Sequence, residues 1–125
     1  MPGVWTGDRV GYLGLSMGAR YGLGVCARLG PTLKPVLGKF GLTAPDPMME
    51  AMAASGVLRD SALGIDAPVL QHVQWDDEIF PLPGQLELFD LFPSPEKTPR
   101  ARPGLHHRTR PDDEDAWCDY LVRHL

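Results

Sequence analysis

The stretch GYLGLSMGARYG, residues 11–22, decides how the rest of the sequence is interpreted. It contains the pentapeptide GLSMG, in which Ser16 has a glycine two residues before it and another two residues after it. This pattern is typical of a sharp turn between a buried strand and a helix, which exposes the serine hydroxyl and places the next backbone N–H beside it. Glycines are expected at Gly14 and Gly18 because side chains there would clash with the neighbouring strand and helix. The motif therefore predicts that Ser16 is a nucleophile.

Short apolar runs alternate with longer helical patterns along the chain. Strand-like residues 9–16 are followed by a helical pattern that stops at Gly30-Pro31, and the same succession then recurs three times. Such alternation predicts an α/β fold, with a four-stranded, mostly parallel sheet and flanking helices on right-handed crossovers. The expected strands are 9–16, 33–42, 67–74 and 97–104, and the expected helices are 17–30, 44–58, 82–92 and 111–125.

Local signals refine two of these elements. Asp46 is the predicted N-cap of the helix over 44–58, and Pro47 occupies its first helical position. The prolines within 97–104 exclude a central place in a sheet, because proline cannot donate to a strand ladder. That strand is therefore expected at an edge.

Composition and charge exclude several classes of protein. The 125 residues are enough for one domain, and 43% hydrophobic with 22% charged residues is usual for a soluble globular protein. A net charge of -4 does not suggest binding to nucleic acid through a basic surface. No apolar run approaches the ~20 residues of a membrane span, and the first residues lack the apolar core of a signal peptide. The expected compartment is the cytoplasm, with no membrane or nucleic-acid partner.

The cysteines and histidines give no metal-binding pattern. Cys26 and Cys118 lie far apart without a CxxC spacing, so two reduced thiols on helices are expected. The four histidines show neither HxxxH nor HxH spacing. We expect no metal site and no cofactor.

Two later loops supply groups that could activate Ser16, because in this architecture the triad runs serine, acid, histidine along the chain. The loop after residues 67–74 offers three adjacent acids, which are Asp76, Asp77 and Glu78. Asp77 is favoured, since the apolar residues that follow it would pin the loop. The loop before the last helix offers His106 and His107.

Three segments carry a resemblance to a known family. RVGYLGLSMGARYG (9–22) resembles the strand and nucleophile elbow of an α/β-hydrolase, and APVLQHVQWDDEIFPLPGQLELFDLF (67–92) resembles its acid loop and following helix. Residues 94–125 resemble the last strand, the histidine loop and the terminal helix. Residues 9–125 as a whole resemble the C-terminal half of an α/β-hydrolase of the dienelactone-hydrolase-like or carboxylesterase-like type.

The resemblance implies a role for each candidate. The nucleophile falls on Ser16, the acid on Asp77 and the base on His106, with the Met17 N–H as one oxyanion donor. His106 is preferred to His107 because the family's histidine usually follows a Pro-Gly-x turn, which residues 103–105 match. Apart from the resemblance, Trp75 abuts the acid loop, where it would be either a residue of the pocket rim or a packed surface tryptophan. The implied activity is hydrolysis of a small carboxylic ester or related acyl compound through an acyl-enzyme.

Three departures from the family pattern qualify this interpretation. Gln74 replaces the usual glycine three residues before the acid, so the acid loop is expected to turn differently. A serine nucleophile points away from dienelactone as substrate. The chain, residues 1–125, is also expected to be a partial domain that lacks the N-terminal strands and the loop with the second oxyanion donor. The alternative is therefore a catalytically silent α/β module, or half of a split hydrolase that self-associates or pairs with a partner chain through a bare edge of strand 9–16.

Overall fold

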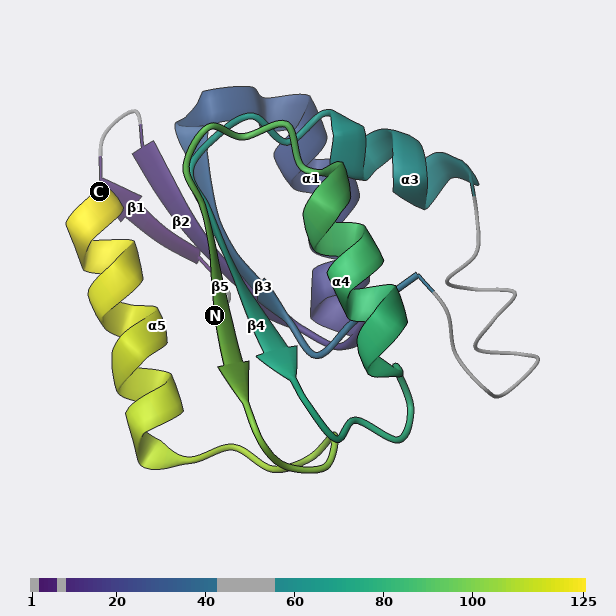
Figure 1. Ribbon diagram of the computed structural model, residues 1–125. Helices are drawn as coiled ribbons and strands as arrows, with labels where there is room; N and C mark the ends of the chain where they lie inside the picture. The colour runs from purple at the N-terminus through teal and green to yellow at the C-terminus, as the bar shows by residue number, and fades with distance from the viewer. Residues whose placement is uncertain (1–2, 7–8, 43–55) are drawn as a thin grey trace.

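The computed structural model describes residues 3–6, 9–42 and 56–125, which form one sheet between two layers of helices (Figure 1). The strands are β1 (Gly3–Thr6), β2 (Arg9–Leu15), β3 (Leu33–Gly38), β4 (Val69–Gln74) and β5 (Lys97–Arg102). The helices are α1 (Met17–Leu29), the short 3-10 helix η1 (Gly30–Thr32), α3 (Gly56–Leu63), α4 (Leu82–Leu91) and α5 (Pro111–His124). Most of the helix predicted over 44–58, including Asp46 and Pro47, lies outside the described residues.

The predicted α/β class and the four parallel strands are confirmed. The sheet has the order β1-β2-β3-β4-β5, and β2 to β5 all run in parallel, with β5 at an edge as its one proline, Pro99, requires. The fifth strand, β1, was not predicted, because four residues are too few to show an alternating pattern.

The edge of β2 differs from the expectation. β1 runs antiparallel to β2 and pairs with residues 9–12, so Gly3 lies opposite Tyr12 and Thr6 opposite Arg9. The prediction of a wholly bare edge on this strand is therefore wrong, because a strand formed by the chain itself occupies its first part.

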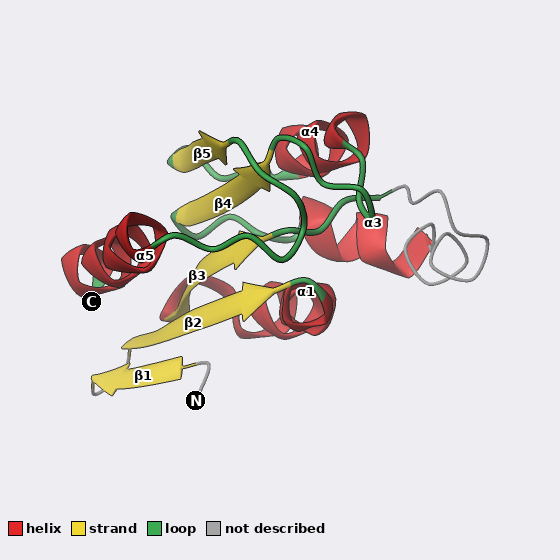
Figure 2. Ribbon diagram, turned by 90° about the horizontal axis from the view of Figure 1, so that it is seen from below, coloured by secondary structure: helices red, strands yellow, loops and turns green. Residues whose placement is uncertain are grey.

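The helices are divided unequally between the two faces of the sheet. α1, α3 and α4 lie together on one face, and α5 covers the other (Figure 2). Each of the first three follows one parallel strand and leads to the next, and right-handed crossovers in a sheet that grows in one direction place such helices on the same face. α5 follows the last strand and is free to pack on the opposite face.

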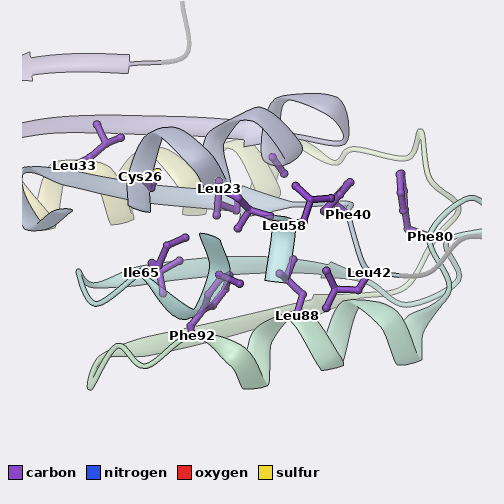
Figure 3. Packing of buried hydrophobic residues seen from close by; sticks show 14 residues of the cluster. Leu23, Cys26, Leu33, Phe40, Leu42, Leu58, Ile65, Phe80, Leu88 and Phe92 are labelled. Carbon is purple, nitrogen blue, oxygen red and sulfur yellow. The ribbon is translucent and has the colours of Figure 1, made fainter. Parts of the chain in front are cut away.

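Two hydrophobic clusters join these layers. The larger one fills the space between the sheet and α1, α3 and α4, and Figure 3 shows its packing. The smaller one lies under α5 and consists of Val36, Leu70, Trp117, Tyr120 and Leu121. Full burial of one such large apolar side chain stabilises the fold by about 1.5–3 kcal/mol, so both faces contribute to stability.

The start of α5 is tied to β5, which limits the freedom of the loop between them. Asp113 is 1% exposed at its side chain and lies 3.2 Å from Arg100 and 3.4 Å from Arg102. Its other carboxylate oxygen accepts a hydrogen bond from the Arg110 N–H at 3.0 Å, which caps the helix. Residues 103–110 are therefore fixed at both ends.

The two cysteines were expected to be reduced thiols on helices. Cys26 on α1 and Cys118 on α5 are both free, the first buried and the second exposed. Burial raises the pKa of the Cys26 thiol to about 12.

No helix in the described part of the chain combines the length and apolar character needed to cross a bilayer.

Candidate active site

Ser16, Asp77 and His106 each follow the carboxyl end of a parallel strand. Ser16 comes directly after β2, Asp77 lies in the loop after β4, and His106 lies in the loop after β5. Because parallel strands end at the same edge of a sheet, these loops converge. The topology therefore brings three residues together that are up to 90 positions apart in sequence.

The backbone at Ser16 adopts a conformation that few non-glycine residues accept. Its φ is 57° and its ψ is -117°, a sparsely populated region that costs about 1–3 kcal/mol. The surroundings hold it there: the Ser16 N–H donates to the Gly38 carbonyl at 2.9 Å, and its own carbonyl accepts from Ala19 and Arg20 in α1. The residue thus sits on a sharp strand-to-helix turn.

Tyr12 explains part of the glycine pattern around this turn. Its ring lies between β2 and α1, and its hydroxyl donates to the Gly18 carbonyl at 2.8 Å. A Cβ on Gly14 would lie 2.5 Å from the Gly18 carbonyl oxygen and 2.6 Å from the Tyr12 ring, and one on Gly22 would lie 2.5 Å from the same ring. Glycine at 14 is therefore required for the predicted steric reason.

Gly18 does not behave as predicted. A Cβ at this position would meet no atom within 4 Å. The expectation of a clash at Gly18 is wrong for the described residues, because no strand or helix of the described chain packs against that side of α1.

A continuous hydrogen-bond path joins the acid, the imidazole and the serine. His106 Nδ1 lies 2.7 Å from Asp77 Oδ2, and His106 Nε2 lies 3.1 Å from Ser16 Oγ. Asp77 Oδ1 accepts from the N–H groups of Ile79 and Phe80, both at 2.8 Å. Since an ionised carboxylate only accepts, the imidazole proton lies on Nδ1, and Nε2 is free to accept from the serine hydroxyl.

The neighbouring acids are used differently. Asp76 Oδ2 accepts from the Gly104 N–H at 2.9 Å, and Glu78 Oε1 accepts from the His106 N–H at 3.2 Å. Both therefore hold the backbone of the histidine loop and make no contact with the imidazole nitrogens. His107 is exposed and meets the His106 ring edge-on, with ring centres 4.9 Å apart. Of the alternatives raised by the sequence, Asp77 and His106 are the ones brought to Ser16.

Met17 and Trp75 are placed less specifically. Met17 is the first residue of α1, where a backbone N–H has no acceptor within the helix. It is therefore available to an acceptor above the turn. Trp75 is 52% exposed, and its backbone N–H donates to the Arg102 carbonyl at 2.8 Å. Among the described contacts, none joins the Trp75 indole to the triad.

Gln74 and Lys39 are two buried side chains that the sequence analysis did not assign to the site. Gln74 Nε2 donates to the carbonyls of Leu105 and Arg108, at 2.6 and 2.8 Å. Lys39 has a φ of 53° and donates from Nζ to the Arg108 carbonyl at 2.9 Å and to Thr109 Oγ1. Burial lowers the pKa of Lys39, an effect that the charges of Asp113 and Asp77 oppose. Both side chains therefore hold the segment that carries His106.

Gln85, on α4, fastens the acid loop to the end of β4. Its Oε1 accepts from the Gln74 N–H at 2.9 Å, and its Nε2 donates to the carbonyls of Gln74 and Phe80, at 2.9 and 2.8 Å. A signal for Gln74 was present in the sequence, because the strand predicted over 67–74 carries polar side chains inside an apolar run. Buried polar groups require partners, so they mark a structured network.

Two surface hollows lie beside α5, and neither contains the triad. One of about 530 Å³ lies against β5, and one of about 370 Å³ lies against β2. The second is lined by Leu13, Leu15, Thr109, Glu114, Trp117 and Cys118. Neither hollow encloses a space over the Ser16 hydroxyl.

Comparisons with known proteins give results only at the level of structure. No protein-family model matches the sequence, and a search of curated proteins finds no significant match. The structure is similar to the native structure of a cold-adapted esterase from an Arctic intertidal metagenomic library, with a TM-score of 0.77 and 32% identity. The match covers 92% of this chain and 49% of the esterase, so the chain spans about half of that protein.

A second enzyme has a similar fold at lower identity. The chain matches the crystal structure of a monoacylglycerol lipase from Paleococcus ferrophilus with a TM-score of 0.74 and 16% identity, over 95% of this chain and 70% of the lipase. Likeness at this identity shows the fold alone. Both neighbours are of the α/β-hydrolase type, and the chain therefore has the fold of part of an α/β-hydrolase.

Proposed function

We propose that this chain is a serine hydrolase for carboxylic esters that works through a triad of Ser16, His106 and Asp77. The observation that carries the proposal is the path of two hydrogen bonds, 2.7 and 3.1 Å long, from Asp77 through His106 to Ser16. Similarity to an esterase over 92% of the chain supports an ester as the substrate class.

In the first half of the proposed reaction, His106 Nε2 takes the proton from Ser16 Oγ while Oγ attacks the ester carbonyl carbon. The carbonyl oxygen gains negative charge, and the Met17 N–H at the start of α1 donates to it. His106 then gives the proton to the departing alcohol, which leaves an acyl group on Ser16. Asp77 holds the imidazole tautomer and stabilises the charged ring.

In the second half, water replaces the alcohol. His106 takes a proton from the water, the oxygen attacks the acyl carbon, and the proton passes to Ser16 Oγ as the carboxylic acid departs. The strained backbone of Ser16 supports this chemistry because it lifts Oγ out of the turn towards the imidazole. We place Trp75, half exposed after β4, at the rim of the substrate site.

Labelling with a fluorophosphonate probe tests the proposal, because the probe needs an activated serine and very little substrate pocket. The purified wild-type protein is expected to be labelled, and Ser16→Ala and His106→Ala are expected to abolish the signal. Ser61→Ala is the matched control, since Ser61 is a partly buried serine on α3 outside the triad. Labelling that persists in Ser16→Ala would refute the assignment of the nucleophile.

A second candidate is that the chain is one part of a hydrolase and is silent alone. Two observations favour it: the chain spans about half of the esterase, and α1 exposes Tyr21, Val25 and Leu29 one turn apart on one face. A hydrolase that has only one of its two oxyanion donors turns over about 10²–10³-fold more slowly, which would make such a part nearly silent by itself. A wild-type protein that is folded by circular dichroism but unlabelled by the probe would favour this candidate over the stand-alone enzyme.

A further inference from the structure

A chain of buried hydrogen bonds runs from α5, through β4, to the histidine loop. The Trp117 indole N–H lies 3.3 Å from His72 Nδ1, and His72 Nε2 lies 2.7 Å from Gln74 Oε1. His72 is 0% exposed and Gln74 1% exposed, so water does not compete for these bonds. None of the three residues touches Ser16 or the His106 ring in the described contacts.

Donor and acceptor chemistry fixes the direction of this chain. An indole N–H can only donate, so His72 Nδ1 must accept and carries no proton. The His72 proton therefore lies on Nε2 and is donated to Gln74 Oε1. That in turn fixes the orientation of the Gln74 amide, whose Nε2 has two hydrogens left for two acceptors. Burial lowers the pKa of His72, which agrees with a neutral ring.

The two acceptors at the end of the chain frame His106. Gln74 Nε2 donates to the carbonyls of Leu105 and Arg108, and the Arg108 N–H itself donates to the Leu105 carbonyl at 3.0 Å. These bonds close a tight turn in which His106 is the second residue. One amide group thus grips both ends of the turn that carries the proposed base.

We propose that Gln74, oriented by neutral His72, is a positioning residue that aims the His106 imidazole at Ser16. The inference rests on the proposed function, because the orientation of His106 towards Ser16 matters only if His106 acts as the base. Gln74 would hold the turn so that Nε2 of His106 stays within hydrogen-bonding reach of Ser16 Oγ. His106 Nδ1 would at the same time keep its hydrogen bond to Asp77. A displacement of about 1 Å between reacting groups can lower a rate about 100-fold.

Gln71 provides a matched control for the test. It lies on the same strand, is 0% exposed against 1% for Gln74, and donates from its amide to one backbone carbonyl, that of Gln85, at 2.8 Å. Gln71→Met and Gln74→Met each remove a buried amide from β4, but only the Gln74 amide touches the histidine loop. Both are expected to lower the melting temperature, so a difference in activity between them reports on positioning.

The first measurement is the rate of fluorophosphonate labelling, normalised to the folded fraction. Gln74→Met is expected to slow labelling about 10- to 100-fold, whereas Gln71→Met stays within about threefold of wild type. Addition of His72→Phe to Gln74→Met is expected to cause no further loss, because both changes break the same chain. Equal rates in Gln71→Met and Gln74→Met would overturn the proposal.

The second measurement does not depend on activity. The proton on His106 Nδ1 lies in a charge-assisted hydrogen bond to Asp77 and should give a downfield proton resonance. This resonance is expected in wild type and Gln71→Met, and it should shift or vanish in Gln74→Met. If Gln74→Met does not fold, the isosteric Gln74→Glu takes its place, since it lacks both donors to the turn.

The labelling rate and the Nδ1 resonance together distinguish a failure of the proposed function from a failure of the positioning role of Gln74. An unlabelled wild type with an Nδ1 resonance that depends on Gln74 would defeat the proposed function and leave the positioning of His106 supported. A labelled wild type whose labelling rate and resonance are unchanged in Gln74→Met and Gln74→Glu would defeat the positioning role alone.

Discussion

The two sides of the proposed triad differ in how the chain holds them. On the loop side, the acid loop and the histidine loop are joined through backbone bonds and through Gln74, Asp76 and Glu78. On the elbow side, Ser16 meets His106 through one bond of 3.1 Å, and Gly18 has no atom of the described chain near the place of a Cβ. The two loops of the proposed triad are thus tied to each other directly, whereas the elbow is held through its own backbone and is open beside Gly18.

The largest expected effect separates two adjacent acids on the loop side. Asp77→Asn removes the acceptor that fixes the His106 tautomer, so the labelling rate is expected to fall about 10⁴-fold. Asp76→Asn keeps an oxygen that can accept from the Gly104 N–H and is expected to change the rate less than threefold. Kinetics of fluorophosphonate labelling measure both. A comparable loss in the two variants would mean that the loop acts as a unit and that Asp77 has no special role.

A smaller effect separates two glycines on the elbow side. Gly14→Ala places a Cβ 2.5 Å from the Gly18 carbonyl oxygen, and the resulting overpacking should cost about 1–3 kcal/mol of unfolding free energy. Gly18→Ala enters open space within α1 and should stabilise the fold by up to about 1 kcal/mol. Urea denaturation measures both. Destabilisation of the same size in both variants would show that Gly18 is covered in solution.

The smallest effect concerns the exposed face of α1. Val25 is 43% exposed, so Val25→Lys should change the unfolding free energy by less than about 0.5 kcal/mol. We expect the same change to weaken any concentration-dependent self-association seen by sedimentation, because a charge interrupts the apolar stripe. A stability loss above 1 kcal/mol would contradict the exposure of this face.

The sequence predicted those features that depend on local pattern. Alternation of apolar and helical runs was enough for the parallel strands, and the GLSMG motif was enough to place a turn at Ser16. β1 escaped because its four residues carry no periodicity. The catalytic roles of Ser16, Asp77 and His106 stay predictions, although the structure brings the three side chains together.

The features that could not be predicted from the sequence depend on contacts between residues far apart in the chain. Gln74 reaches Arg108 across 34 positions, and Lys39 reaches it across 69. Nothing near either residue in the sequence specifies such a partner. The error at Gly18 has the same origin, because a clash depends on which element packs beside a helix, and this cannot be derived from the helix itself.

The strand order of the sheet determines the order in which the strands can be added as the chain lengthens. Since every strand lies beside the strand that precedes it in sequence, four strands can be laid down before β5 is needed. The pairing of Ser16 with His106 spans 90 positions and closes only after β5 has been added. A growing or shortened chain that stops before residue 106 therefore has Ser16 and Asp77 but lacks His106, and the proposed triad comes together only after most of the sheet is complete.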